Sequence, residues 1–438
     1  MQAIKQLTLL LLLVPSLLYG QQRTIEYVEY TLDNGLHVIL HQDNSAPIVA
    51  VSTMYHVGSK DEVPGRTGFA HFFEHVASRG TKNIPVGEFT KYVENAGGRR
   101  NANTTFDRTY YYEILPSNQL KLGLWLASER LLHMTIDSVV VETQREVVKE
   151  EKRLRYDNRP YGTVFQEMLK RAYKVHPYQW TVIGSMEDLD AATIESFTDF
   201  NKRFYVPNNA VLSIAGDLDI EETRQLIDAY FSGIPGGAPI ERNYPEEPAL
   251  EAEIIDTVYD NIQLPAVIYG YHMPAEGTDD YYALSMLNRV LSGGASSRLP
   301  KSIRDEQSLA LSVSSFLVSN EEPGLFMLFG VVKNEVPLTD LQDAIDAEIE
   351  KVKAEGITDR EFQKIRNQVE NDFVSSNSSM AGIAESLANY HMYYGDAGLI
   401  NTEIERYMAV TPEQIQAVAE KYLKQDSRVI LHFLPKAN

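Results

Sequence analysis

The stretch GFAHFFEHVASRGT, residues 68–81, places His71, Glu74 and His75 within five positions in the order H-x-x-E-H. On an α-helix, residues four apart lie on one face, so the two imidazoles can converge on one metal ion. Glu74 lies on nearly the same face, where its carboxylate can take a proton from a water that the metal has made acidic. The alternative is an apolar core helix that carries two histidines, because three aromatic residues share the segment: Phe69, Phe72 and Phe73.

Two histidines leave a catalytic metal site one ligand short, because such a site has three protein ligands and an exchangeable water. The chain contains no cysteine, so the third ligand must be a carboxylate or a histidine from another segment. In VETQREVVKEEKRLRYD, helical phase places Glu151 on a face shared with three apolar residues: Val147, Val148 and Leu154. A carboxylate on such a face is costly unless something pairs with it. We therefore predict Glu151 as the third ligand and interpret Glu146 and Glu150 as ion-paired surface residues.

Length and charge limit the class of protein. A chain of 438 residues is too long for one ordinary core, which favours two or more domains. The apolar content of 44% and charged content of 23% are typical of globular proteins. The formal net charge of −21 argues against nucleic acid as a partner, because a phosphate backbone would be repelled.

The N-terminal sequence MQAIKQLTLLLLLVPSLLYG is typical of a secretory signal peptide. It contains one lysine, an apolar run from Leu7 to Leu18, and the small residue Gly20. A membrane anchor is the alternative, but the run is short for a bilayer span of about 20 residues. No later stretch is long and apolar enough to span a membrane. We expect a signal peptide over residues 1–20 and an exported, periplasmic protein that does not span a membrane.

The expected elements occur twice in the same order. The first series contains a hairpin that turns at Asn34-Gly35, helices near 67–78 and 136–156, and a buried strand at 209–218. A Gly-, Pro- and Glu-rich stretch follows, and strands and helices then begin again without a second H-x-x-E-H. We predict an α+β fold of two similar domains, each a mainly antiparallel sheet with helices on one face, which together enclose a cavity. The expected ranges are 21–235 for the metal-binding domain, 236–260 for a linker region and 261–438 for the homologous second domain.

HFFEH followed by Glu151 resembles the pitrilysin/insulinase family of zinc metallopeptidases, the inverzincins, which includes the mitochondrial processing peptidase. Other blocks match family blocks in the expected order, and the resemblance covers essentially the whole chain after the signal. It is strongest to short bacterial members with two domains. The resemblance implies one Zn²⁺ per chain, bound by His71, His75 and Glu151, with Glu74 as the general base. The matching blocks are NGLHVIL, GRTGFAHFFEHVASRGT, NANTTFDRTYYY, QREVVKEE, HPYQWTVIG, YVPNNAVLSIAGDL and LSGGASSRLPKSIRDEQSLAL.

The block NANTTFDRTYYY resembles the edge strand along which family members bind an extended peptide. Asn101 and Ala102 occupy positions where main-chain contacts to the substrate are expected. The alternative is an ordinary strand over Asn101 to Tyr112 with aromatic packing. Arg304 matches a family arginine that contacts substrate near the bond to be cut.

Two positions depart from the family pattern. Gln144, seven positions before Glu151, replaces a supporting acidic residue, which we expect to weaken zinc affinity or ligand orientation. Leu311, seven positions after Arg304, replaces a tyrosine whose hydroxyl could stabilise an oxyanion. Two explanations follow: a weaker or differently organised peptidase, or a protein that works with a partner. We expect a dimer, either a heterodimer with a paralogue that lacks the metal site and has an intact arginine–tyrosine pair, or a homodimer.

These features together predict a zinc-dependent endopeptidase or oligopeptidase that cuts short or unfolded peptides with a water activated by Glu74. A scaffold or peptide-binding subunit of a heterodimeric peptidase, which has kept its metal but does not catalyse, is one alternative. The intact set of histidines and glutamates argues against it. A metal-dependent hydrolase of non-peptide substrates is the other, and the substrate-strand block argues against that.

Overall fold

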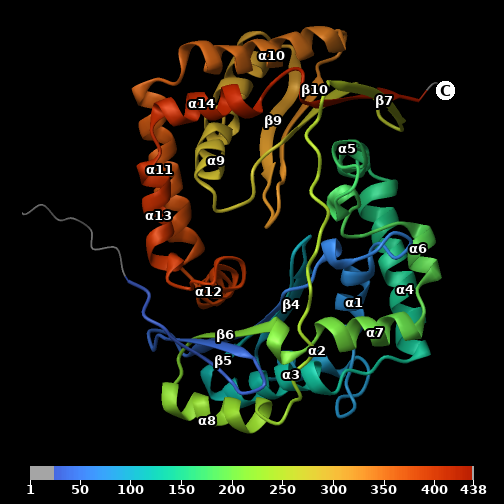
Figure 1. The fold of residues 1–438 in the computed structure, drawn as a ribbon, viewed down its shortest axis with the longest axis vertical. Helices are drawn as coiled ribbons and strands as arrows, with labels where there is room; N and C mark the ends of the chain where they lie inside the picture. Colours follow the sequence, from blue (N-terminus) through green and yellow to red (C-terminus); the bar gives the residue numbers. More distant parts are fainter. Residues whose placement is uncertain (1–23, 437–438) are drawn as a thin grey trace, which may run out of the picture.

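The protein is described from a computed structural model that covers residues 24–436. The expected signal peptide lies outside these described residues. The described chain forms two β-sheets, one in each half of the sequence, and each sheet has its own group of helices (Figure 1). No helix in residues 24–436 is both long enough and apolar enough to cross a membrane.

The first sheet has six strands in the order β1-β2-β6-β3-β5-β4. All neighbours are antiparallel except β2 and β6. The predicted hairpin forms between β1 and β2, where Gly35 has a φ of +89°, a conformation that favours glycine. The strands are β1 (Val28–Thr31), β2 (His37–Gln42), β3 (Ile48–Tyr55), β4 (Arg99–Thr104), β5 (Thr109–Pro116) and β6 (Ala210–Gly216).

The helices of the first half include the predicted metal-binding helix and the helix that carries Glu151. Most are α-helices: α1 (Phe69–Ala77), α2 (Glu88–Asn95), α3 (Leu120–Leu132), α4 (Ser138–Lys152), α5 (Val164–Ala172), α6 (Met186–Ala191), α7 (Ile194–Phe204) and α8 (Ile220–Phe231). Short 3₁₀ turns connect them: η1 (Ser59–Asp61), η2 (Ser117–Gln119), η4 (Pro177–Gln179) and η5 (Pro207–Asn209). One π-helical segment, η3 (Arg153–Asp157), continues α4 directly.

The second sheet has five strands in the order β7-β11-β8-β10-β9. Its strands are β7 (Ile254–Asp260), β8 (Ala266–His272), β9 (Ala310–Val318), β10 (Leu325–Val332) and β11 (Val429–Pro435). Its helices are α9 (Asp279–Ser292), the π-helical η6 (Pro300–Glu306), α10 (Leu338–Glu355), α11 (Asp359–Ser376), α12 (Met380–Tyr394), α13 (Leu399–Ala409) and α14 (Pro412–Tyr422). Strand β7 thus occupies the end of the range expected to be a linker.

The two sheets share one topology. In each half the first core strand (β2 or β7) runs parallel to the last strand (β6 or β11). The last strand is antiparallel to the second (β3 or β8), and β5-β4 or β10-β9 completes the sheet in antiparallel order. The predicted fold of two similar, mainly antiparallel α+β domains is therefore confirmed, and β1 is an addition to the first copy.

Each sheet is covered by helices on both faces, because each half contributes one helix to the sheet of the other half. Helix α12 of the second half packs its Ile383, Ala384 and Leu387 against the first sheet, on the face opposite to α1 and α3. Helix α5 of the first half packs Met168 and Leu169 against the second sheet in the same way. We expected helices on one face of each sheet, but they cover both faces. Neither sheet would be covered on both faces without the other half of the chain.

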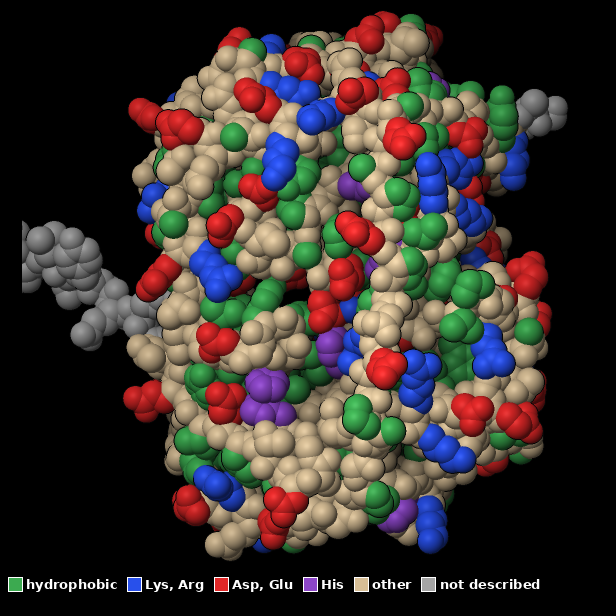
Figure 2. Space-filling view, viewed as in Figure 1, with side chains coloured by type: hydrophobic (Ala, Val, Ile, Leu, Met, Phe, Trp, Pro, Cys, Tyr) green, Lys and Arg blue, Asp and Glu red, His purple; other side chains and the backbone are tan. Residues whose placement is uncertain are grey.

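A space remains between the halves, beside helix α12. Figure 2 shows the surface hollowed there. One cavity, of about 290 Å³, is lined from the first half by Asp107 and Arg108 and from the second by Glu276 and Asn389. Next to this cavity, the turn between β9 and β10 connects the two halves, because Glu321 in the turn forms ion pairs with His56 and Lys60 of the first half. Burial alone would raise the pKa of Glu321, but these two partners outweigh it and lower the pKa to about 2.

Candidate metal centre

Helix α1 is fixed at its N-terminus by a buried carboxylate. Glu62 accepts hydrogen bonds from the backbone N–H groups of Gly68 and Ala70, at 2.9 and 2.7 Å. These N–H groups have no partner inside the helix, and a negative charge at this end also interacts favourably with the helix dipole. Gly68 has a φ of +81°, and a Cβ atom at this residue would lie 2.4 Å from the carbonyl oxygen of Ile183. A glycine is therefore required at the start of the helix.

The aromatic face of α1 packs into the first core. Phe69, Phe72 and Phe73 are all buried. The rings of Phe69 and Phe72 lie 4.4 and 4.6 Å from the ring of Phe197 on α7, measured between centroids. The histidines lie on the opposite face. The core-helix and metal-helix interpretations of HFFEH are therefore compatible, because each uses a different face of α1.

His71, His75 and Glu151 converge in the structure. Oε2 of Glu151 lies 3.8 Å from Nε2 of His71 and 3.4 Å from Nε2 of His75, and one potential ligand atom from each residue lies within 4.8 Å of the others. Ligand atoms about 2.0–2.1 Å from a tetrahedral zinc ion are about 3.3 Å apart, close to these separations. The two imidazole planes are 77° apart, so they intersect and one ion can lie in both planes. The donor set fits a metal such as zinc.

The position of Glu151 in this cluster does not follow from the apolar residues near it in the sequence. Of the three apolar residues that placed it on an inward face, only Val148 is buried, whereas Val147 is 44% exposed and Leu154 is 64% exposed. That argument for an apolar face is therefore wrong. Glu151 lies in the last turn of α4, just before the helix widens into η3, so the α-helical phase does not continue to Leu154. A π-turn of this kind is common beside functional residues.

The second oxygen of Glu151 is held by Arg155, whose Nη1 lies 2.8 Å from Oε1. This leaves Oε2 directed at the two histidines. The hydrogen bond with His75 lowers the pKa of Glu151, and the charges nearby outweigh the effect of burial. Burial lowers the pKa of His71 to about 4, with a further contribution from His75. Near neutral pH, Glu151 is therefore an anion and His71 is neutral, which are the forms that bind a metal.

Glu74 lies beside the cluster without being part of it. Its side chain is buried, and its Oε2 accepts a hydrogen bond of 2.5 Å from Oγ1 of Thr104 at the end of β4. Burial raises the pKa of Glu74, and the hydrogen bond from Thr104 opposes this shift. A raised pKa makes a carboxylate a stronger base. Thr104 could not be predicted from the sequence, because its contact with α1 exists only in the folded chain.

Strand β4 contains Asn101 and Ala102 and is the last strand of its sheet. NANTTFDRTYYY forms two strands, because β4 ends at Thr104 and β5 begins at Thr109. Alternate residues of β4 face α1 and α2, as shown by the contact of Thr104 with Glu74 and that of Arg100 with Thr90. A cavity of about 260 Å³ lies between this strand and the cluster and is lined by both Asn101 and Ala102, together with Glu74 and His75.

The remaining positions singled out from the sequence lie in different surroundings. Gln144 is buried on α4 and lines the same cavity. Arg304 lies in η6, where its exposed guanidinium pairs with the neighbouring Asp305 at 2.7 Å. Leu311 is on β9 and is 62% exposed. No interaction among the described residues connects Arg304 with α1 or β4, so its contact with substrate stays a prediction.

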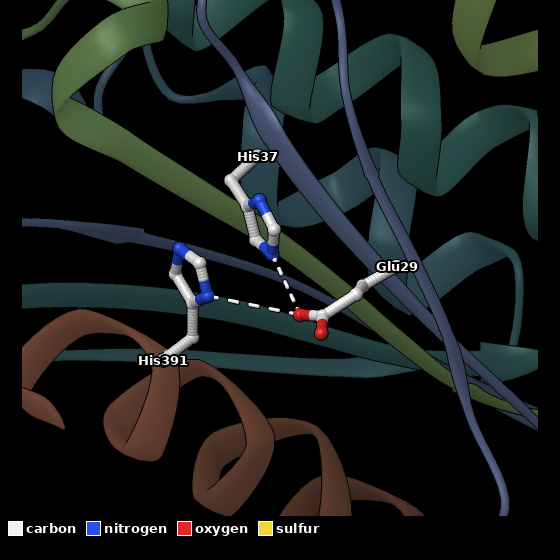
Figure 3. Close-up of side chains that lie close together, drawn as sticks. All are labelled: Glu29, His37 and His391. Atoms are coloured by element: carbon white, nitrogen blue, oxygen red, sulfur yellow. Dashed lines mark hydrogen bonds and ion pairs between the residues drawn. The ribbon is translucent and has the colours of Figure 1, made fainter. Parts of the chain in front are cut away.

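A second cluster of two histidines and a glutamate joins the two halves. Glu29 of β1, His37 of β2 and His391 of α12 approach one another, as Figure 3 shows. Oε2 of Glu29 lies 3.0 Å from Nε2 of His37 and 3.7 Å from Nδ1 of His391. The imidazoles are stacked, with centroids 3.4 Å apart and planes only 6° apart. An ion cannot lie in both of two parallel, separated ring planes, so this cluster does not fit a metal as it stands.

The comparisons with known proteins agree with the fold. A family model described as "Insulinase (Peptidase family M16)" matches residues 37–185, and one described as "Peptidase M16 inactive domain" matches residues 191–369. The zinc protease PqqE of Helicobacter pylori is 30% identical over 98% of this chain and 97% of its own length. The chain belongs to peptidase family M16.

Two further matches extend over nearly the whole chain. The uncharacterised zinc protease YmxG of Bacillus subtilis is 25% identical over 92% of this chain and 97% of its own length. The crystal structure of a protease from Helicobacter pylori superimposes with a TM-score of 0.90 at 29% identity, and covers 94% of this chain and 100% of that one. The matches to the family therefore include both halves of the chain, and not the H-x-x-E-H helix alone.

Proposed function

We propose that the protein is a zinc-dependent peptidase that cuts short or unfolded peptides at the cluster of His71, His75 and Glu151. The convergence of these three side chains, with ring planes that admit one ion, is the observation that carries the proposal. Membership of a family whose relatives are named zinc proteases supports zinc as the metal. The edge position of β4 beside the cluster supports a peptide as the substrate.

When bound, zinc supplies a Lewis acid that polarises a carbonyl and lowers the pKa of a water molecule. Glu74 is positioned to take the proton of that water, because it is buried next to His75 and its raised pKa makes it a stronger base. It can then deliver the proton to the leaving nitrogen of the peptide bond. Thr104 holds Oε2 of Glu74, so the other oxygen, Oε1, is the one available for proton transfer.

Strand β4 binds the substrate in this proposal. An extended peptide can pair with the free edge of a sheet through main-chain hydrogen bonds, which depend little on the peptide's sequence. Pairing with β4 brings a peptide next to α1, because Thr104 of this strand touches Glu74. Folded proteins do not present such an extended segment, so the expected substrates are short or unfolded.

The substitution Glu74→Gln tests the mechanism. It keeps the shape of the side chain but removes the base, so the protein should keep its zinc and lose turnover by a factor of about 10³ or more. Zinc content by mass spectrometry and cleavage of a mixed peptide library measure the two effects. Equal cleavage by variant and wild type would refute the role of Glu74. Wild-type protein that binds zinc and peptide but cuts nothing would support a non-catalytic subunit instead.

The location and assembly of the protein are also proposals. The N-terminal sequence supports export to the periplasm with removal of residues 1–20, which N-terminal sequencing of the protein from its source would test. Leu311 in place of the family tyrosine supports a dimer, with a paralogue or with a second copy. Native mass measurement of protein from its source decides between these, and a fully active monomer would contradict both.

A further inference from the structure

The cavity between α1 and β4 contains two arginines that the proposed mechanism does not use. Arg79 follows the C-terminal end of α1, and Arg100 lies on β4. Both are half-buried, and the Nε atom of each is buried without a hydrogen-bond partner. Arg100 donates one hydrogen bond, to Oγ1 of Thr90, and its guanidinium lies over the ring of Phe89 at 4.9 Å.

These two positive charges are poorly neutralised. In the described part of the chain, no ion pair within 4.0 Å joins a carboxylate to Arg79 or Arg100, although thirty-one such pairs join other residues. Glu113, opposite Arg100 on β5, is paired with Arg130 at 2.7 Å. The carboxylate of Glu74, in the wall of the same cavity, interacts with the charge of Arg100 but forms no ion pair with it within 4.0 Å. Burial lowers the pKa of Arg100, and the charge of Arg79 is among the further causes. Gln144, also in the cavity wall, is neutral. Buried charges without partners are costly, which favours an anion from outside.

The cavity adjoins the residues that would cut the peptide. The same wall contains Glu74 and His75 of the metal centre and Asn101 and Ala102 of the proposed peptide-binding strand. A water molecule occupies about 30 Å³ in the liquid. The cavity volume of about 260 Å³ therefore has room for a whole side chain. A residue of the peptide bound next to the scissile bond would place its side chain here.

We propose that this cavity is a specificity subsite for a carboxylate of the peptide, bound by Arg79 and Arg100 beside the bond that is cut. The proposal rests on the peptidase function proposed above and adds the class of substrate, peptides with Asp or Glu next to the scissile bond. A carboxylate suits two guanidinium groups, because each offers paired N–H donors and the hydrogen bonds are charge-assisted. The C-terminal carboxylate of a short peptide has the same chemistry and is the other possible source.

Matched peptides test the subsite on the zinc-loaded protein. In each pair a single Glu replaces a Gln, and the replacement is moved through every position around the bond that is cut. At one position the Glu peptide should be preferred by about tenfold or more in kcat/KM, as expected for charge-assisted hydrogen bonds in a half-buried site. Versions with free and amidated C-termini separate a side-chain carboxylate from a terminal one.

Variants of Arg79 give the sharpest readout, because within residues 24–436 its side chain forms no hydrogen bond. Arg79→Gln should abolish the preference for Glu over Gln, and Arg79→Glu should reverse it in favour of Lys. Arg360→Gln, which removes an exposed arginine on α11, is the control and should keep the preference. Zinc content and melting temperature establish that each variant is folded.

A binding measurement removes the dependence on turnover. Glu74→Gln protein loaded with zinc should bind the Glu peptide about tenfold more tightly than the Gln peptide, and adding Arg79→Gln should remove the difference. Cleavage of both peptides with equal kcat/KM at every position would overturn the subsite and leave the peptidase function standing. Failure of the protein in its native assembly to cut any peptide would overturn the peptidase function, and the binding measurement would still decide whether the cavity takes a carboxylate.

Discussion

Two clusters in this protein have the same composition, two histidines and a glutamate, but different geometry. In the α1–α4 cluster the imidazole planes are 77° apart and the histidines lie one turn apart on a single helix. In the β1–β2–α12 cluster the planes are 6° apart and the rings are stacked. The carboxylate distances are similar, at 3.4 and 3.8 Å in the first and 3.0 and 3.7 Å in the second. Ring orientation, and not distance, distinguishes them.

The difference shows how backbone position determines what a set of ligand-type residues can do. A helix places i and i+4 side chains side by side with room for an ion between them. A strand and a helix that pack face to face bring their rings together flat, and the rings themselves fill the space. We therefore expect the α1–α4 cluster to respond to metals and the β1–β2–α12 cluster to respond to protons.

The largest expected difference is in metal content. His71→Ala should remove tightly bound zinc and reduce peptide cleavage by about 10³-fold or more, because a catalytic site needs three protein ligands. His391→Ala, the matched change in the other cluster, should leave about one zinc per chain. Metal analysis after dialysis measures both. If the wild type binds a second zinc and the His391→Ala variant loses it, the β1–β2–α12 cluster also binds metal and the expected difference between the clusters is wrong.

Metal removal should change stability through one cluster only. A ligand at 100 times its Kd stabilises the folded state by about 2.7 kcal/mol, so chelation should lower the melting temperature by several degrees. Calorimetry of zinc-loaded and chelated protein measures the shift. The His37→Ala variant should show the same shift as the wild type. A smaller shift in that variant would mean that its cluster also binds zinc.

A smaller effect, on zinc affinity, is expected when the ion pair between Arg155 and Glu151 is removed. Arg155→Ala releases the carboxylate oxygen that does not face the histidines, and should weaken zinc affinity by about tenfold, as is typical for partners that orient a ligand. Arg153→Ala is a matched control, because Arg153 pairs with Glu150 on the surface at 3.1 Å. Competition with a fluorescent zinc chelator measures both affinities. Equal affinities in the two variants would show that Arg155 does not orient Glu151.

The smallest expected effect is on the pH dependence of stability, and it tests the stacked cluster. Burial lowers the pKa of His37 and of His391, although Glu29 opposes the shift in both cases. The folded state therefore binds fewer protons than the unfolded state, and the free energy of unfolding should fall as the pH decreases below about 6.5. Melting curves between about pH 7.5 and 5 measure this fall.

The control for this prediction is the His391→Gln variant, which removes one titrating ring from the stack. Its melting temperature should fall less steeply with decreasing pH than that of the wild type. Both proteins should be compared without metal, so that zinc release does not contribute. An identical pH dependence in the two proteins would show that the stacked pair does not sense protons.

Local sequence was sufficient where the chemistry lies within one element. The i, i+4 spacing of His71 and His75 determines that they share a face, and the phenylalanines determine which face is buried. The repeat of strand and helix patterns similarly predicted two related sheets. Glu151 converges with the two histidines, but the argument from its apolar neighbours failed. Val147, one turn earlier on α4, is exposed, and a π-helical segment interrupts the phase between Glu151 and Leu154.

Only the tertiary structure decided the contacts between distant segments. The hydrogen bond from Thr104 to Glu74, the shared cavity of Arg79 and Arg100, and the stacking of His37 with His391 bring together residues that are distant in the sequence. The exchange of α5 and α12 between the halves is of the same kind, because a helix's apolar face does not specify which sheet it will cover. Periodicity reports which side of an element is buried. The identity of the surface that buries it depends on the packing of the whole chain.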